Sequence, residues 1–385
     1  HDLTENIIHL VLARTTDAPK GTKGISLFLV PKFEVSDDGV VGSRNGVSTN
    51  SIESKMGIKG SPTCVLNFEN SKGVMIGPEN KGLNSMFTMM NLERIVVGVQ
   101  GLGIAETAYQ NAVAYSKERK QGKANNSKNG ETDLIIKHAD IRRSLMNMKS
   151  IIEGQRSFAF WLSQQIDVSL SHDDKDVRGD ASNMVALLTP VIKSFFTDNG
   201  VEITNDAIQV FGGYGYTKDQ GIEQLFRDNR ITPIYEGTNS VQAIDLVYRK
   251  ISSEGIFENF IKSMDNEIKN YKNEKNLESF LNIFEKYREI LVSFTKWMRE
   301  KINSNKDDAS AACNDYLKVL GYTALAFAWI KTLKISFEKQ NSNKEFYEDK
   351  INTGKYYFEK ILPRAQSHYV VGTSGSHTTM NAKFN

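Results

Sequence analysis

The chain has 385 residues, more than one hydrophobic core usually holds, so two or three packed units are expected. Lys and Arg number 48 against 46 Asp and Glu, a balance that argues against nucleic-acid binding but permits a local basic cleft. The distant Cys64 and Cys313 indicate neither a disulfide framework nor a metal site, and no apolar run approaches the ~20 residues of a membrane span. These features predict a cytoplasmic protein, or a mitochondrial-matrix protein in a eukaryote.

Residues 1–82 are predicted to form a partial middle β domain. Four apolar or β-branched runs are separated by segments rich in turn residues, which is typical of a small antiparallel sheet. The runs lie at residues 7–13, 24–30, 64–68 and 74–76. The chain starts with His rather than Met, and the run at 7–13 is already strand-like. Folds usually cover such an open strand edge, so an N-terminal part of the domain is expected to precede residue 1.

Residues 83–254 are predicted to form a four-helix bundle, because apolar residues recur every three to four positions in four segments. These positions are Leu92, Val96, Val99 and Leu102; Ile141, Leu145, Met148 and Ile152; Leu188, Ile192 and Phe195; and Val241, Ile244 and Tyr248. Polar segments at 122–133 and 168–180 are predicted loops. After a break at 251–255, residues 255–385 are predicted to be an additional C-terminal helical domain. The expected fold class is mostly α with a small antiparallel β region.

Glycines mark two places where the backbone is expected to pack closely. Gly98, Gly101 and Gly103 lie within the first predicted helix, where each costs up to about 1 kcal/mol relative to Ala. Tight helix packing is the commoner cause of such a cluster, and close approach of a ligand is the alternative. The segment 209–239 carries two glycine-bearing turns around a short charged helix. They indicate either ordinary helix ends or backbone that approaches a ligand.

Glu236 stands between Pro233 and Gly237 in an irregular stretch that leads into a helix, with Thr238 or Asn239 as its cap. A partly desolvated carboxylate in such a turn suits a general base. The alternative is a surface Glu favoured by the helix dipole, and spacing alone favours this alternative. The FGGYGY motif lacks the G-x-G-x-x-G spacing and follows a helix, which argues against a dinucleotide fold. Of the six histidines, His138 and His172 are interpreted as surface residues.

Taken together, these segments resemble the acyl-CoA dehydrogenase family over nearly the whole chain. The resemblance is carried by KMGIKGSPTCVLNFEN at 55–70, NLERIVVGVQGLGIAETAYQNAVAYSKERKQG at 91–122, QVFGGYGYTKDQGIEQLFRDNRITPIYEGT at 209–238, and the C-terminal helices. It looks closest to the subgroup with an extra C-terminal helical domain, which includes 3-methylmercaptopropionyl-CoA dehydrogenase.

The resemblance implies that FAD is the cofactor and that it lies between the β domain and the bundle, partly held by a neighbouring subunit. The implied cofactor contacts are Arg119 and Gln121 at the pyrophosphate, Gln209, Gly212 and Gly213 at the adenosine end, and Thr238 and Ser240 beside the cofactor. Two positions depart from the family's pattern, since Phe often precedes the glycine that is Gly122 here and Gln is common at position 240.

The same resemblance implies that Glu236 is the catalytic base and takes the α-proton of an acyl thioester while the β-hydrogen leaves as hydride to the flavin. The base's own backbone N–H would help to polarise the thioester carbonyl. Some family members place the base where Glu93 stands, but those members usually lack a Glu in the later turn, so Glu236 is favoured. The implied substrate-site residues are Glu93, Arg94, Tyr235 and Gly237.

The function implied is dehydrogenation of an acyl-CoA, either 3-methylmercaptopropionyl-CoA or a fatty acyl-CoA, to the trans-2-enoyl-CoA. The electrons would pass to an electron-transfer flavoprotein. The alternatives are an acyl-CoA oxidase and a non-catalytic acyl-CoA-binding relative. A homodimer is expected, with the C-terminal domain packed on the bundle over a surface that shorter relatives use to form tetramers. Without an N-terminal helical domain, this chain is expected to bind FAD poorly.

Overall fold

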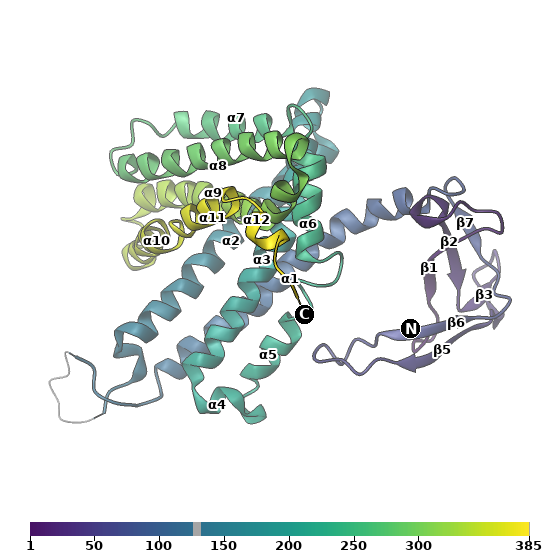
Figure 1. Cartoon of the computed structure of the whole chain (residues 1–385). Helices are drawn as coiled ribbons and strands as arrows, with labels where there is room; N and C mark the ends of the chain where they lie inside the picture. The colour runs from purple at the N-terminus through teal and green to yellow at the C-terminus, as the bar shows by residue number, and fades with distance from the viewer. Residues whose placement is uncertain (126–131, 385) are drawn as a thin grey trace. The chain divides into compact units, whose positions relative to one another are not determined.

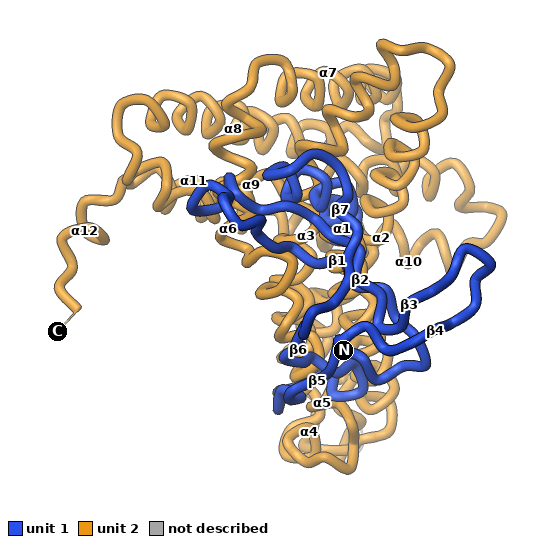
Figure 2. The backbone as a smooth tube through the Cα atoms, turned by 90° about the vertical axis from the view of Figure 1, so that its right-hand side faces the viewer, with its two compact units in different colours: residues 1–93 blue, residues 94–385 orange. Residues whose placement is uncertain are grey.

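The computed structural model describes residues 1–125 and 132–384 and divides into two compact units, residues 1–93 and 94–385 (Figures 1 and 2). The division falls within the long helix α1 (Gly82–Ser116). Most described residues are helical and the strands form small antiparallel sheets, which confirms the predicted fold class. The domain boundaries at 82/83 and 254/255 stay predictions.

The first unit contains three small antiparallel sheets. Strands β1 (Ile8–Ala13), β2 (Ser26–Pro31) and β7 (Val74–Ile76) pair in the order β1-β2-β7, β3 (Phe33–Val35) pairs with β4 (Val41–Arg44), and β5 (Val47–Ile52) pairs with β6 (Cys64–Phe68). The four predicted strands are confirmed. Sequence reasoning missed β3, β4 and β5, and β4 lies where a turn segment was expected. All four β4 side chains are exposed, so the strand shows no apolar alternation.

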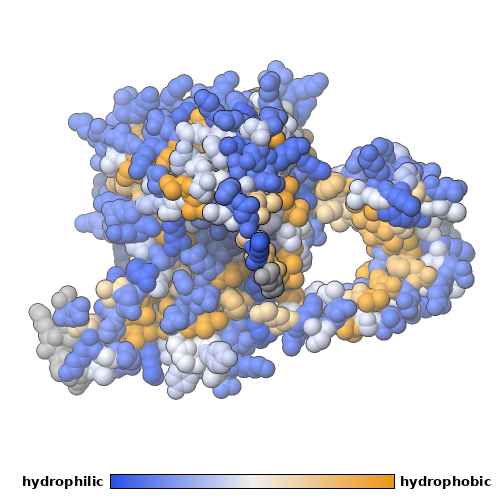
Figure 3. All heavy atoms as spheres, in the orientation of Figure 1, coloured by the Kyte–Doolittle hydropathy of each residue, from blue (hydrophilic) through white to orange (hydrophobic). Residues whose placement is uncertain are grey.

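Strand β1 is an edge strand, since among the described residues it pairs only with β2. Ile8, Leu10 and Leu12 point to one face of the strand and are exposed. Hydrophobic residues are visible over the strands of this unit in Figure 3. The edge strand predicted at 7–13 is therefore present, with an apolar face that the described residues of the unit leave uncovered.

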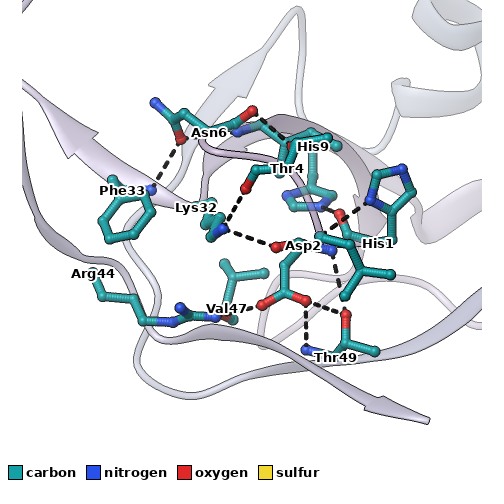
Figure 4. Close-up of polar contacts among 12 residues, drawn as sticks. His1, Asp2, Thr4, Asn6, His9, Lys32, Phe33, Arg44, Val47 and Thr49 are labelled. Carbon is teal, nitrogen blue, oxygen red and sulfur yellow. Dashed lines mark hydrogen bonds and ion pairs between the residues drawn. The ribbon is translucent and has the colours of Figure 1, made fainter. Parts of the chain in front are cut away.

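A polar cluster fixes residues 1–6 to the rest of the first unit (Figure 4). The Asp2 carboxylate forms an ion pair with Arg44 and accepts hydrogen bonds from the hydroxyl and the backbone N–H of Thr49. The Thr49 hydroxyl is the main cause of a lowered pKa at Asp2. Lys32 Nζ donates to the carbonyl oxygens of Asp2 at 2.8 Å and Thr4 at 2.5 Å. These contacts join the segment before β1 to strands β4 and β5 and to Lys32, which directly follows β2.

The second unit is helical. After α1 come α2 (Ala139–Ser171), α3 (Lys175–Phe211), α4 (Gly213–Tyr216), α5 (Ile222–Asn229) and α6 (Asn239–Asp245). The C-terminal part holds α7 (Ile256–Lys269), α8 (Glu278–Ser304), α9 (Lys306–Lys339), α10 (Lys344–Tyr356), α11 (Arg364–Thr373) and α12 (His377–Met380), with π-helical turns at Leu246–Ile251 and Tyr357–Ile361.

The two predicted loops of the bundle have different outcomes. The prediction of a long loop at 168–180 was wrong, because α2 ends at Ser171 and α3 begins at Lys175. Asp174 caps α3 by accepting hydrogen bonds from the N–H groups of Asp176 and Val177. The polar residues that were interpreted as a loop therefore form the capped start of a helix. Of the predicted loop at 122–133, residues 126–131 lie outside the described residues.

Helices α1 and α3 approach each other closely at two of the three predicted glycines. A Cβ added at Gly98 would lie 2.7 Å from the carbonyl oxygen of Ile192, and one at Gly101 would lie 3.1 Å from Thr197 Cα. A Cβ at Gly103 would meet nothing within 4 Å. Tight helix packing is therefore confirmed for Gly98 and Gly101 but not for Gly103.

This difference predicts opposite effects for two identical substitutions in one helix. We expect Gly98→Ala to destabilise the chain by about 1–3 kcal/mol, because backbone atoms of α3 must move to admit the methyl group. Gly103→Ala is expected to stabilise it by up to about 1 kcal/mol, because Ala restricts the unfolded chain and meets no neighbour. Urea-unfolding midpoints of the two variants and the wild type measure both effects. Equal shifts for the two variants would contradict the close approach at Gly98.

The side of α1 that is buried differs from the side that its periodicity indicated. Leu92, Val96 and Val99 are exposed, whereas Ile95 and Leu102 are buried. The same holds on α6, where Val241 and Ile244 are exposed and Ala243 is buried. The pattern predicted the helices correctly, but part of the apolar surface does not contribute to the core of the described chain.

The C-terminal helices pack on the bundle through α9, as predicted. Trp329 of α9 is 1% exposed, and its Nε1–H donates to the carbonyl oxygen of Ser150 on α2 at 3.0 Å. A Cβ at Gly154 would lie 2.7 Å from Trp329 Nε1, so the indole fits against bare helix backbone. Tyr322 of α9 meets Phe195 of α3 edge to face, with centroids 4.8 Å apart. Residues 94–385 thus form one compact unit with a continuous core.

Candidate functional site

The turn between α5 and α6 has an unusual backbone. Glu236 has φ +56° and Gly237 has φ +85°, so two consecutive residues are left-handed. For a residue with a side chain, this conformation costs about 1–2 kcal/mol and persists only where surrounding contacts hold it. Here the Asn239 N–H donates to the carbonyl of Pro233 at 3.0 Å, and Gln242 Nε2 donates to the carbonyl of Glu236 at 3.1 Å.

Helix α6 begins directly after this turn. The Thr238 hydroxyl accepts a hydrogen bond from the Val241 N–H at 3.3 Å, which confirms the predicted cap. Glu236 itself is half-buried. In the part of the chain that the structure describes, no group accepts a hydrogen bond from the backbone N–H of Glu236. The turn therefore presents a carboxylate and a backbone donor from the same residue.

Helix α1 contributes two polar side chains to this turn. A Cβ added at Gly237 would lie 3.9 Å from a terminal nitrogen of Arg94, whose side chain is buried. The Tyr235 hydroxyl donates to Gln100 Oε1. The structure thus brings together Arg94, Tyr235, Glu236 and Gly237, four of the five residues predicted to form the catalytic and substrate site.

Glu93, the alternative base, is half-buried on α1. Within the described ranges 1–125 and 132–384, its carboxylate has no recorded hydrogen bond or ion pair. Its backbone is helical, in contrast to the left-handed backbone of Glu236. Of the two carboxylates, only Glu236 is held in a conformation that its surroundings must enforce.

Apolar side chains remain exposed next to the turn. Ile234 precedes it, and Val241 and Ile244 follow it on α6. Val96, also exposed, lies one helical turn from Gln100, the partner of Tyr235. The surroundings of Glu236 therefore combine a charged group with apolar surface, which suits a ligand that has an apolar part next to a polar reacting centre.

Beneath the turn lies Lys193 of α3, which sequence reasoning missed. Its side chain is 0% exposed, and Nζ donates to the carbonyl oxygen of Gly237 at 2.8 Å and to Asn239 Oδ1 at 2.9 Å. Burial lowers the pKa of Lys193 to about 8. The sequence does contain a sign of this role. Lys193 lies between the apolar pairs Val191-Ile192 and Phe195-Phe196, and a lysine in such a buried stretch usually has a partner.

A second cluster collects most of the predicted cofactor residues. Arg119, Gln121, Gly212 and Gly213 line one cavity of about 290 Å³. Gln209 adjoins it, since its carbonyl accepts a hydrogen bond from the Gly212 N–H at 3.1 Å. The remaining lining residues are Tyr115, Ile135, His138, Asp140, Ile141, Val210, Phe211 and Tyr214. Residues almost one hundred positions apart in the sequence therefore meet at one site.

The chemistry of this cavity suits a ligand that carries phosphate and a flat ring. The Arg119 guanidinium lies over the Tyr214 ring, 5.6 Å from its centroid, and provides a positive charge. Gly212 has φ +62°, and a Cβ at Gly212 or Gly213 would meet nothing within 4 Å, so a ligand can reach the backbone there. His138 is partly exposed, lines the cavity and contacts the Gln121 carbonyl oxygen at 2.8 Å.

The two remaining predicted cofactor residues, Thr238 and Ser240, do not line this cavity. They lie at the start of α6, next to Glu236. Ser240 Oγ is 3.5 Å from Asn314 Nδ2 on α9, so the C-terminal helices reach the start of α6. The seven predicted cofactor residues thus divide into five at the cavity and two at the Glu236 turn.

Two expected absences concern the described residues alone. No helix among residues 1–125 and 132–384 combines the length and the apolar character needed to cross a bilayer. The same residues contain no group of three or more His, Cys, Asp or Glu side chains placed to hold a metal ion.

Comparison with protein families gives two matches that follow each other along the chain. Residues 80–251 match the acyl-CoA dehydrogenase C-terminal domain, and residues 260–383 match the acetyl-CoA dehydrogenase C-terminal-like domain. The first match includes both Glu236 and the cavity at Arg119. The second covers α8 to α12 and all but the first residues of α7.

Curated relatives and solved structures agree with these matches. A 3-methylmercaptopropionyl-CoA dehydrogenase of Ruegeria pomeroyi is 43% identical over 66% of this chain and 43% of its own length. A butyryl-CoA dehydrogenase of Syntrophomonas wolfei is 33% identical over 94% of this chain and 62% of its own length. The chain therefore spans less than two thirds of these relatives.

Among solved structures, Caenorhabditis elegans ACDH-11 in complex with C11-CoA superimposes with a TM-score of 0.73 at 22% identity, covering 98% of this chain and 61% of that one. An acyl-CoA dehydrogenase of Bacillus anthracis complexed with FAD gives 0.73 at 19% identity, covering 97% of this chain and 62% of that one. At these identities the likeness shows the shared fold.

Proposed function

Because this chain belongs to the acyl-CoA dehydrogenase family, we propose that it is part of an FAD-dependent enzyme that converts an acyl-CoA thioester to the trans-2-enoyl-CoA. The observation that carries this proposal is the left-handed turn at Glu236, which presents a carboxylate and a backbone donor beside exposed apolar side chains. A general base next to an apolar surface is what removal of a proton from an acyl chain requires.

Two groups of Glu236 act in the proposed reaction. The carboxylate accepts the proton from the α-carbon of the substrate, and the backbone N–H donates a hydrogen bond to the thioester oxygen. That hydrogen bond matters because charge develops on this oxygen as the proton leaves, and a donor that is already in place stabilises it. The exposed side chains of Ile234, Val241 and Ile244 contact the acyl chain and exclude water from the carboxylate.

The cavity at Arg119 fits the pyrophosphate and adenosine of FAD. Arg119 and Gln121 supply hydrogen-bond donors for the phosphates, Gly212 and Gly213 approach the adenosine with bare backbone, and Gln209 adjoins them. When bound, FAD accepts the β-hydrogen of the substrate as hydride. We propose that this cavity holds the FAD of a neighbouring subunit in a homodimer, while Thr238 and Ser240 lie beside the FAD of their own subunit.

We expect Arg119→Met to weaken FAD binding by about tenfold or more. The change removes the charge that faces the phosphates, and a hydrogen bond to a charged group contributes about 1.5–3 kcal/mol. Ultrafiltration of released flavin, or fluorescence titration of the apoprotein with FAD, measures the affinity. Lys117→Met, which lies outside the lining of the cavity, is the matched control and should leave the affinity unchanged. If both variants bind FAD as the wild type does, the cavity is not the pyrophosphate site.

The substrate is proposed from the relatives, and the electron acceptor from the family resemblance of the sequence. Their names include 3-methylmercaptopropionyl-CoA and butyryl-CoA, so we propose a short acyl-CoA as substrate. We propose an electron-transfer flavoprotein as acceptor and a cytoplasmic location. An acyl-CoA oxidase remains the second candidate, since the Glu236 chemistry is the same and the two enzymes differ only in how the reduced flavin is reoxidised.

Anaerobic flavin reduction tests the proposed function. Purified protein loaded with FAD is mixed with 3-methylmercaptopropionyl-CoA, butyryl-CoA or longer thioesters, and the visible absorbance of the flavin is followed. Bleaching together with enoyl-CoA formation supports the proposal. Peroxide released in air at the rate of turnover identifies an oxidase instead. Acyl-CoA binding without bleaching by any thioester would favour the non-catalytic relative.

A further inference from the structure

Lys193 carries a buried positive charge that has no role in the reaction as proposed so far. It lies in the middle of α3, 0% exposed, among the core residues Ile192, Phe195 and Phe196. Burial of an ammonium group is strongly unfavourable unless hydrogen bonds and opposite charges compensate for it. In the described chain its two recorded acceptors are the Gly237 carbonyl oxygen and Asn239 Oδ1. Both belong to the segment that carries Glu236.

A hydrogen-bond network continues from Lys193 through the side chain of Asn239. Asn239 Nδ2 donates to Asp198 Oδ1 at 2.7 Å and to Thr197 Oγ1 at 3.0 Å, both on α3. Both the oxygen and the nitrogen of the Asn239 side-chain amide are therefore hydrogen-bonded to residues of α3. Lys193 connects this network to the turn, because its Nζ also donates to the Gly237 carbonyl oxygen at 2.8 Å.

Charged groups surround Lys193 from three elements. Burial is the main cause of its lowered pKa, Asp198 on α3 and Glu236 in the turn raise the pKa, and Arg94 on α1 lowers it. The ammonium group therefore lies close enough to Glu236 for an electrostatic interaction. A positive charge behind a carboxylate, within a poorly solvated site, acts more strongly than the same charge on the surface.

Resting on the proposed function, we propose that Lys193 is a positioning residue for the catalytic base. By holding the Gly237 carbonyl, it keeps Glu236 and Gly237 left-handed, so that the carboxylate and the Glu236 N–H both face the substrate.

The geometry supports a role in positioning rather than in core stability alone. The left-handed Glu236 needs enforcement, and besides the backbone bond from Asn239 to Pro233, side chains hold the carbonyl groups of Glu236 and Gly237. Gln242 Nε2 contacts both, at 3.1 Å for Glu236 and 3.4 Å for Gly237, and Lys193 supplies the shorter bond to Gly237. Both recorded acceptors of the Lys193 ammonium group lie in the segment that carries Glu236, so its hydrogen bonds act on this turn.

The test compares Lys193→Met, Lys193→Gln and the control Lys350→Met. Methionine fills the space without donors or charge, and glutamine keeps a donor without charge. Lys350 is largely buried in an ion pair with Glu153, 2.8 Å apart, between α10 and α2, away from the turn. We expect Lys193→Met to lower the limiting rate of flavin reduction about 100-fold with KM changed less than threefold, since small displacements of catalytic groups have such effects. Glutamine should restore part of the rate, and Lys350→Met should leave it unchanged.

The pH profile distinguishes positioning from general destabilisation. In the wild type the rate is expected to fall above about pH 8, where Lys193 loses its proton. In Lys193→Met this alkaline decline should vanish, because the group that loses its proton is gone. A variant that is merely less stable would keep the wild-type profile.

Hydrogen exchange of peptides that cover residues 232–242 gives a readout independent of catalysis. Exchange there is expected to be faster in Lys193→Met than in the wild type, and unchanged in Lys350→Met. If the wild type reduces no flavin with any thioester, the proposed function fails, and the exchange measurement still decides whether Lys193 holds the turn. If Lys193→Met retains rate, pH profile and exchange, the proposal is overturned; if it does not fold, Lys193→Gln decides by the same measurements.

Discussion

Glu236→Gln is expected to lower the rate of substrate-dependent flavin reduction by about 10²–10⁴-fold, the contribution usual for a general base. Glutamine has the shape of glutamate and leaves the backbone N–H in place, but its amide cannot accept the α-proton. Binding of the acyl-CoA should therefore change less than threefold. Anaerobic stopped-flow measurement of flavin bleaching gives the rate, and the absorbance change on titration with an enoyl-CoA gives the affinity.

Glu93→Gln is the matched control, because it makes the same change on the helix that carries Arg94. We expect less than a tenfold loss of rate for this variant. The reason is that Glu93 has ordinary helical backbone, whereas the surroundings of Glu236 hold a costly left-handed conformation. A large loss in Glu93→Gln with a fully active Glu236→Gln would move the base to α1.

Trp329→Ala is expected to destabilise the chain by about 3–5 kcal/mol, the usual effect of removing a large buried aromatic side chain. The indole is 1% exposed, lies against Gly154 and donates a hydrogen bond to the Ser150 carbonyl at 3.0 Å. Its removal leaves a cavity between α9 and α2 and an unsatisfied backbone acceptor. Chemical unfolding followed by circular dichroism measures the change.

Phe160→Ala serves as the control, because this aromatic side chain of α2 is 72% exposed. Its loss should change stability by less than about 0.5 kcal/mol, as is usual for surface substitutions. If Trp329→Ala instead separates unfolding into two steps without lowering the first midpoint, the C-terminal helices and the bundle would be independent folding units. A single cooperative loss is what one shared core requires.

The interface at Trp329 also bears on the site. Helix α9 contacts α2 and α3 through its apolar side chains and reaches Ser240 through Asn314. The C-terminal helices thus support the helices that carry Lys193 and the start of α6. We expect Trp329→Ala to affect the exchange of residues 232–242 less than Lys193→Met does, because Lys193 bonds to the turn directly, whereas Trp329 bonds to Ser150 on α2.

Local patterns in the sequence by themselves determined four of the strands, the helices of the bundle and the cap of α6. Apolar runs predicted β1, β2, β6 and β7, and a three-to-four-residue period predicted the bundle helices. A local pattern also predicted the cap at Thr238. The cofactor residues Arg119, Gln121, Gly212 and Gly213 were implied by the family resemblance, and they line one cavity. Such features depend on neighbours a few positions away, or on motifs whose residues carry their chemistry with them.

Tertiary structure alone decided which side of each helix is buried and what supports Glu236. The period of α1 does not reveal that Val96 and Val99 stay exposed, because that depends on which elements pack against the helix. Lys193 lies 43 positions before Glu236, and only the crossing of α3 beneath the turn joins its ammonium group to Gly237. A long-range contact of this kind leaves no local pattern, since it forms only when the whole unit has folded.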